Sequence, residues 1–114
     1  MKKHFFALLA IWLLSACAPQ EMYYWGDYNK AVYDHQKKQT ESSKKVLLKT
    51  FEEIISKSKR KGTRKQVPPG IYADYGFHLL QDGQVEKGMR MLEKEKELYP
   101  ESEQMVNYLM SQFK

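Results

Sequence analysis

The pattern of apolar positions divides the chain into a short leader and a longer amphipathic part. An unbroken apolar run covers residues 5–14. Beyond residue 25, apolar residues recur every three or four positions, which is the period of a helix with one buried face. We find no convincing run with the two-residue alternation of a half-buried strand. The sequence therefore predicts an all-α protein after a distinct N-terminal segment.

Turn signals divide the amphipathic part into about five helices. Pro68-Pro69-Gly70 marks a loop, Gln81-Asp82-Gly83 marks a tight turn, and Pro100 blocks the continuation of the helix before it. Gly62 is the expected C-cap of a long second helix. We expect antiparallel helix pairs joined by short turns. The expected helices cover residues 27–38, 41–61, 71–80, 85–98 and 101–113.

The same period predicts which side chains face the core. The expected inward positions are, helix by helix, Tyr28, Ala31, Val32 and His35; Leu47, Phe51, Ile54 and Ser58; Ile71, Tyr72, Tyr75, Gly76 and Leu79; Val85, Met89 and Leu92; and Met105 or Val106, Leu109, Met110 and Phe113. Just before the first helix, an aromatic cluster presents two alternatives, packing in the core or contact with a membrane or protein interface. We expect Trp25 and Tyr28 in the core, with Tyr23 and Tyr24 exposed.

The leader has the features of an export signal. Its apolar run of ten residues is shorter than the roughly twenty that span a membrane, but it fits a secretory signal of about 7–15 residues. The run ends in Leu14-Ser15-Ala16-Cys17, which matches the bacterial lipobox. We expect cleavage of residues 1–16 and a diacylglyceryl thioether plus an N-acyl chain on Cys17. An ordinary signal peptide with a chance cysteine is the alternative. Residues 17–24 are then a lipidated tether, and residues 25–114 are the helical domain.

Length, charge and cysteine content limit the remaining choices. A chain of 114 residues with a formal charge of +5 allows one small domain. Its one cysteine excludes an internal disulfide framework and a cysteine-rich zinc site. Because lipid occupies that thiol, it is not a catalytic nucleophile. Ala18, in place of the aspartate that retains many lipoproteins in the inner membrane, favours the periplasmic face of the outer membrane.

Residues 69–100 resemble a tetratricopeptide repeat, a pair of antiparallel helices. Tyr72 falls at the usual tryptophan position, and Gly76 and Gly88 fall at the small positions where the two helices approach each other. Glu95 departs from the pattern, since a small alanine is expected there. This departure argues against tight packing on a following repeat.

The chain also resembles a family of small bacterial lipoproteins, domain of unknown function 4810 (DUF4810). The residues that carry the resemblance are the runs 24–28 (YWGDY), 67–76 (VPPGIYADYG) and 93–102 (EKEKELYPES). The resemblance implies no established activity. It implies an envelope assembly, because members are often encoded beside a curli-secretion-like (CsgG-like) lipoprotein and another small lipoprotein.

Catalytic and metal-binding patterns are missing from the sequence. His35 and His78 lie in separate predicted helices without the spacing that converging metal ligands need. No nucleophile elbow, phosphate loop or dinucleotide fingerprint occurs. The carboxylates of residues 93–97 are expected on a solvated helix face. We therefore predict no enzymatic activity, no metal and no cofactor besides the lipid on Cys17.

A basic stretch over residues 57–65 is the strongest charge feature. Its positive residues are Lys57, Lys59, Arg60, Lys61, Arg64 and Lys65. A solvated, mobile linker is one interpretation. A contact with anionic headgroups, with lipopolysaccharide, with an acidic partner or with the acidic residues 93–103 is the other. Nucleic acid is not an expected target, because the protein is exported.

These features favour a non-enzymatic adaptor or subunit of an envelope complex. A groove between helices 71–80 and 85–98 is expected to take a partner peptide or helix. Tyr72, Tyr75 and Arg90 are the residues predicted on that surface. The partner is expected among envelope lipoproteins, and self-association is left open. The alternative is a lipoprotein that binds the cell wall or another anionic envelope surface through residues 57–65.

Overall fold

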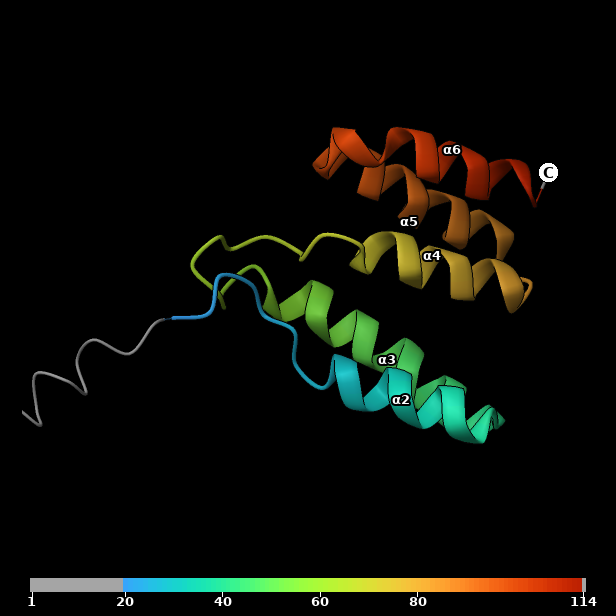
Figure 1. The fold of residues 1–114 in the computed structure, drawn as a ribbon, viewed down its shortest axis with the longest axis horizontal. Helices are drawn as coiled ribbons and strands as arrows, with labels where there is room; N and C mark the ends of the chain where they lie inside the picture. The colour runs from blue at the N-terminus through green and yellow to red at the C-terminus, as the bar shows by residue number, and fades with distance from the viewer. Residues whose placement is uncertain (1–19, 114) are drawn as a thin grey trace, which may run out of the picture.

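The computed structural model describes residues 20–113, which form an all-α fold (Figure 1). The predictions for residues 1–16 and for Cys17 lie outside this part of the chain. Within it, five α-helices run antiparallel to their neighbours along the chain, as the sequence predicts. They are α2 (Tyr28–Lys38), α3 (Glu41–Lys57), α4 (Ile71–Gln81), α5 (Val85–Leu98) and α6 (Glu103–Ser111), with a short 3₁₀ turn, Pro100–Ser102, before α6.

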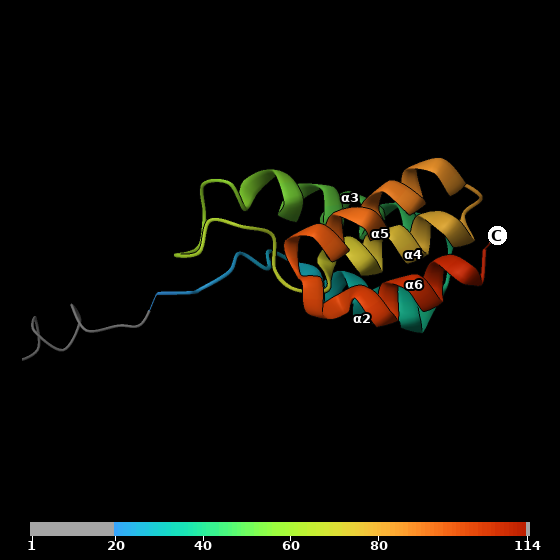
Figure 2. The ribbon, with the colours of Figure 1, turned by 90° about the horizontal axis from the view of Figure 1, so that it is seen from above.

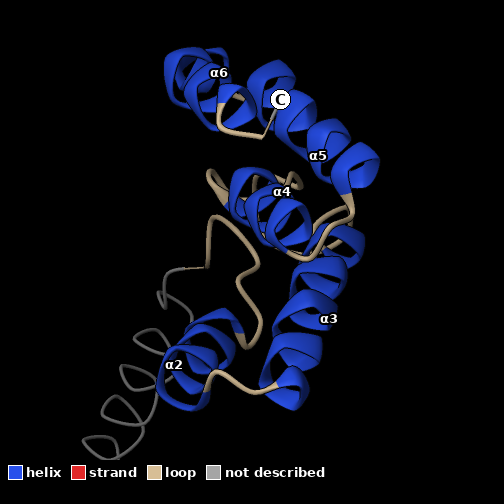
Figure 3. Ribbon diagram, turned by 90° about the vertical axis from the view of Figure 1, so that its right-hand side faces the viewer, coloured by secondary structure: helices blue, strands red, loops and turns tan. Residues whose placement is uncertain are grey.

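The helices stack in two offset rows, with α4 near the centre. Figure 3 shows α2 and α6 on one side and α3 and α5 on the other, and the view from above in Figure 2 agrees. One buried cluster joins α2, α3 and α4 through Phe51, Ile54 and Tyr75. A second joins α4, α5 and α6 through Leu80, Leu92 and Val106. Because α4 contributes to both clusters, it links the two halves of the core.

The predicted inward positions are buried or partly buried, except for two that are exposed. The whole stripe of α3, including Ser58, is confirmed. Val85 is 46% exposed because it opens α5 at the edge of the pair. In α6 the sequence did not decide whether Met105 or Val106 faces inward. The structure buries Val106 and exposes half of Met105.

The aromatic cluster before α2 is arranged differently from the prediction. Trp25 is 38% exposed rather than buried, although its ring approaches that of Tyr28 at 5.6 Å. Tyr24 is half-buried and packs against the first cluster, where it was expected to be exposed. The reversal follows from the path of the backbone, which is fixed by hydrogen bonds to the loop after α3 described below.

Helix α3 ends at Lys57, four residues before the predicted end at Lys61. Arg60 N–H and Lys61 N–H both donate to the Lys57 carbonyl at 3.0 Å, so one further turn is hydrogen-bonded without continuing as regular α-helix. Gly62 follows with a left-handed φ of 81°, so the chain turns there instead of capping the helix.

The contact between α4 and α5 depends on two glycines, as the repeat pattern predicts. A Cβ atom on Gly76 would lie 2.8 Å from the carbonyl oxygen of Gly88, and one on Gly88 would lie 2.9 Å from that of Gly76. Both distances are shorter than van der Waals contact, so only glycine allows this approach. The two backbones therefore touch at these glycines, and the hollows that border the pair lie beyond this contact, one of them lined by Tyr72, Lys94, Glu97 and Leu98.

Glu95 is buried, and its position explains why a carboxylate replaces the expected small residue. It is 1% exposed. Its Oε2 accepts a hydrogen bond from the Gly70 N–H and its Oε1 accepts one from the Ala73 N–H, both at 3.1 Å. A side chain of α5 thus caps the first turn of α4, where free N–H groups and the helix dipole favour an anion.

Candidate functional site

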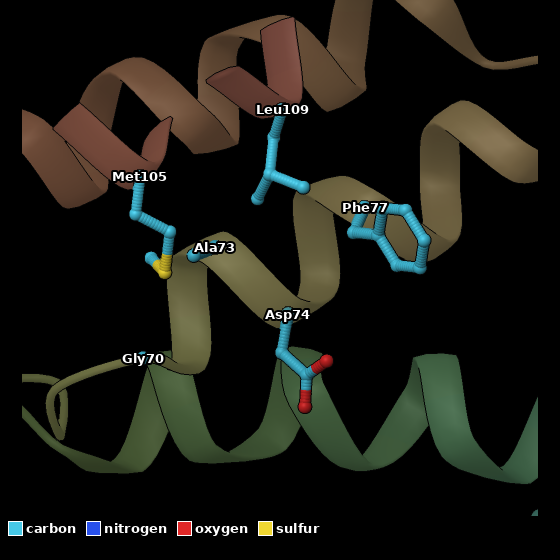
Figure 4. Close-up of a pocket in the computed structure, with 6 residues that line it drawn as sticks. All are labelled: Gly70, Ala73, Asp74, Phe77, Met105 and Leu109. Atoms are coloured by element: carbon cyan, nitrogen blue, oxygen red, sulfur yellow. The ribbon is translucent and has the colours of Figure 1, made fainter. Parts of the chain in front are cut away.

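An open apolar groove lies between α4 and α6. It has a volume of about 250 Å³. Figure 4 shows Met105 and Leu109 reaching down from α6 toward Ala73 and Phe77 of α4. The six residues that line it are Gly70, Ala73, Asp74, Phe77, Met105 and Leu109.

Small residues on α4 keep this groove open. Gly70 precedes the helix and Ala73 lies one turn further, so no large side chain fills the space beneath Met105. Further along, the Phe77 ring meets the Phe113 ring with centroids 6.1 Å apart, which closes that end. Val106 holds α6 in the second cluster and thereby directs Met105 and Leu109 to the groove.

Asp74 is the one charged residue among those that line the groove, and its carboxylate points away from α6 (Figure 4). Its Oδ2 accepts a hydrogen bond of 2.8 Å from the Tyr28 hydroxyl, and its Oδ1 lies 3.9 Å from His78 Nε2. Burial raises the pKa of Tyr28 to about 12, and the bond to the Asp74 carboxylate adds to this shift. The tyrosine therefore stays neutral, and about a third of the Asp74 side chain remains open to solvent.

The two histidines predicted to lie in separate helices are close neighbours. The rings of His35 and His78 lie 6.0 Å apart. Burial is the main cause that lowers the pKa of His78; the charge of Asp74 opposes this shift and that of His35 adds to it. Among residues 20–113, no group of three potential metal ligands converges.

A serine–histidine contact beside this pair has a structural role. His35 Nδ1 lies 2.8 Å from Ser43 Oγ. That hydroxyl donates to the Thr40 carbonyl at 2.9 Å and accepts from the Thr40 N–H at 3.0 Å, as part of the capping box of α3. These hydrogen bonds to the backbone of Thr40 hold the Ser43 hydroxyl at the start of α3, where it caps the helix.

The three residues predicted for partner binding do not come together. The Tyr75 ring is buried, and its hydroxyl donates to Glu52 at 2.8 Å between α3 and α5. Tyr72 is half-buried with the Lys94 ammonium 5.7 Å from its ring centre. Arg90 is exposed beside a separate shallow hollow next to the turn at Gly83. Tyr75 lines a hollow shared with α3 and α5, and Tyr72 lines another shared with α5. The apolar groove described above is a separate one, between α4 and α6.

The sequence contained a signal for the observed groove. Ala73 and Phe77 share one face of α4 at a spacing of four, and Met105 and Leu109 do the same on α6. Their apolar faces exceed what one core cluster buries. The prediction did not use this signal, because the tetratricopeptide-like pattern favoured a surface between α4 and α5.

The basic stretch is ordered against the segment that precedes α2. Thr63 N–H donates to the Glu21 carbonyl at 3.1 Å, and Arg64 N–H donates to the Met22 carbonyl at 3.0 Å. The ammonium groups of Lys57 and Lys61 lie 5.9 and 5.2 Å from the centre of the Tyr24 ring. Part of the predicted tether is therefore paired with the domain.

The helices and the groove define an all-α protein of antiparallel helix pairs. None of the helices within residues 20–113 has the length and apolar character needed to cross a membrane. Residues 22–109 match the model of the family described as Domain of unknown function (DUF4810), so the chain belongs to this family. Comparisons with curated proteins and with solved structures gave no match.

Proposed function

We propose that this protein is a lipid-anchored, tetratricopeptide-like adaptor that binds an envelope partner in the α4–α6 groove without catalysing a reaction. The observation that carries the proposal is the groove itself, an apolar hollow between α4 and α6 lined by Ala73, Phe77, Met105 and Leu109. Apolar grooves between helices commonly take the apolar face of a partner helix.

The dimensions and lining of the groove indicate the chemistry of the partner. Its volume of about 250 Å³ is smaller than the roughly 300–1,000 Å³ of small-molecule sites, but it suits one or two large apolar side chains. The Asp74 carboxylate points away from Met105 and Leu109 (Figure 4) and accepts the hydrogen bond from Tyr28. The partner segment is therefore expected to carry one or two large apolar anchors.

The location is proposed from the sequence of the leader. Leu14-Ser15-Ala16-Cys17 supports lipidation of Cys17 after cleavage of residues 1–16, and Ala18 supports the periplasmic face of the outer membrane. The neighbours implied by the family resemblance, a CsgG-like lipoprotein and another small lipoprotein, are the first partners to test.

The test uses a photo-crosslinking residue at Met105 in the full chain, expressed in bacteria that carry the neighbouring lipoproteins. Met105 lines the groove, whereas Tyr108 of the same helix is 64% exposed and does not line it. We expect crosslinks to one or two envelope lipoproteins in fixed ratio from position 105 and not from position 108. A Cys17→Ala variant reports whether capture requires the lipid.

Groove variants provide the second part of the test. Met105→Glu places a charge in an apolar site, so it should remove partner capture, while Tyr108→Glu should preserve it. Equal capture by both variants would reject the groove. The alternative is a protein that binds an anionic surface. It would be supported if only cell-wall or lipopolysaccharide fragments are recovered and if moderate salt releases them.

A further inference from the structure

The basic stretch and the segment before α2 form one surface at the end of the molecule where the described chain begins. Figure 1 shows residues 20–27 beside the loop after α3, at the end opposite the C-terminus, and Figure 2 shows both extending beyond the helices. The two backbone hydrogen bonds from Thr63 and Arg64 join them. We call this surface, residues 21–25 with residues 57–65, the basic end.

Gly62 is required for this arrangement. A Cβ atom at this position would lie 2.7 Å from the Met22 carbonyl oxygen, and the φ of 81° is one that other residues rarely adopt. The glycine thus allows residues 62–64 to pass directly against residues 22–23. The loop is consequently held against the N-terminal segment rather than extending freely into solvent.

The side chains of the basic end combine positive charge with apolar and aromatic groups. Met22 is 49% exposed and Trp25 is 38% exposed, while Tyr24 lies under the ammonium groups of Lys57 and Lys61. Tyrosine and tryptophan side chains, each with one polar end, are favoured at the interface between membrane and water.

The charges of the basic end are largely available for an external partner. Lys57 lies 3.9 Å from Glu53, but Lys59, Arg60, Lys61, Arg64 and Lys65 have no ion pair within residues 20–113. Glu21 is the one carboxylate of this surface. Six positive charges against one negative charge make it attractive to an anionic layer.

We propose that the basic end lies on the phospholipid bilayer and binds anionic headgroups. This inference rests on the proposed lipidation of Cys17. Glu21 lies four positions after Cys17, and a chain extends at most about 3.6 Å per residue, so the anchor lies within about 14 Å of the loop contact. Basic residues so close to a bilayer lie within the range of its surface potential.

A docked basic end would fix the orientation of the adaptor at the membrane. A lipid chain alone leaves the attached domain free to tilt, whereas a second attachment through a charged patch restricts it. The end of the molecule at the turn between α2 and α3 would then point away from the bilayer (Figure 1).

The experiment uses the lipidated protein reconstituted into vesicles of phosphatidylcholine, with or without phosphatidylglycerol. The amines are acetylated for a fixed time, and mass spectrometry measures the reaction at Lys57, Lys59, Lys61 and Lys65. Lys38 and Lys45, at the opposite end, serve as internal controls. We expect the loop lysines to react about threefold more slowly in anionic vesicles than in neutral ones, with no change at the controls.

Charge variants give the matched comparison. Arg60→Glu/Lys61→Glu/Arg64→Glu should abolish the protection of the remaining loop lysines. Lys38→Glu/Lys45→Glu/Lys49→Glu, the same charge change at exposed positions of α2 and α3, should leave it intact. Thermal unfolding of each variant reports on folding, and the unmodified protein tests the proposal even if a variant is unstable.

The outcomes separate this inference from the proposed anchoring. The mass of the N-terminal peptide shows directly whether Cys17 carries lipid. Lipidated protein with equal lysine reactivity in both vesicle types would overturn headgroup binding and leave the anchor in place. Unlipidated protein that binds only anionic vesicles, with protected loop lysines, would support headgroup binding and reject the anchor. Unlipidated protein that binds neither type would reject both.

Discussion

Glu95 illustrates how one residue can join two helices that share few other polar contacts. Its carboxylate accepts hydrogen bonds from two N–H groups at the start of α4 while its backbone belongs to α5. It thus performs the role that a serine or aspartate just before the helix usually has, since Gly70 at that position has no side chain.

Glu95→Ala should lower the free energy of unfolding by about 2–4 kcal/mol, because two N–H groups lose their acceptor and each unsatisfied buried donor costs about 1–3 kcal/mol. Urea denaturation measures this loss. Glu97→Ala, at an exposed position of the same helix, should change stability by less than about 0.5 kcal/mol. A loss below about 1 kcal/mol for Glu95→Ala would show that water replaces the cap.

His78 should make stability depend on pH. Because burial lowers its pKa below the ordinary value of 6.5, the unfolded chain binds a proton before the folded one does as pH falls. Stability is therefore fully present above about pH 6.5 and decreases as the pH falls below it. Asp74 and His35 face this ring and act in opposite directions on its charge.

His78→Gln should flatten the pH dependence between about pH 7.5 and 5.5, because the titrating group is removed while a polar side chain remains. Thermal unfolding at a series of pH values measures it. The exposed Lys30→Gln variant, in α2, is the control and should follow the unmodified protein. An unchanged slope in His78→Gln would assign the pH dependence to another group.

At the residue scale, the sequence predicted burial well where it follows the helical period and poorly where it depends on distant contacts. It placed the α3 stripe correctly because burial there repeats with the helical period. The sequence prediction exchanged the environments of Tyr24 and Trp25, because the path of this segment depends on contacts with the loop at 62–64. It also placed Glu95 on a solvated face, because the burial of this side chain depends on contacts with the start of α4. Each contact spans more than twenty residues of sequence. Such contacts leave no local pattern.

At the scale of elements, the two helices α4 and α5 depend on their glycine contact. Gly88→Ala should destabilise the fold by about 1–3 kcal/mol through crowding against the Gly76 carbonyl and Leu80, despite alanine's helix propensity advantage of about 1 kcal/mol. Denaturation with urea measures the balance. Ser42→Ala, at an exposed position of α3, is the control for an alanine substitution that meets no crowding. A stabilised Gly88→Ala variant would show that the helices separate at little cost.

Helix limits were predictable where a specific residue ends or begins a helix. The turn at Gly83 and the stop before Pro100 are found as expected. The end of α3 was predicted wrongly, because residues 58–61 form a hydrogen-bonded turn before Gly62 and not a further turn of regular helix. The α4–α6 groove was not predicted, since the sequence alone left the inward residue of α6 undecided between Met105 and Val106.

At the scale of the whole molecule, the two core clusters share α4, so they should unfold together. Leu92→Ala in the second cluster should cost about 2–5 kcal/mol, and it should speed the exchange of protected amides in α3 as much as in α5. Native-state hydrogen exchange measures both helices at once. The exposed Gln104→Ala variant is the control. Faster exchange confined to α5 and α6 would indicate two independent units.

The hydrogen bonds from Thr63 and Arg64 to residues 21–22 also have a mechanical consequence. A tensile force applied at the N-terminus reaches this short contact before it reaches α2. The contact therefore bears the first load, while the helices beyond it remain unstrained. Until those two hydrogen bonds break, a force on the N-terminal segment is transmitted to the molecule through the loop and does not unfold α2.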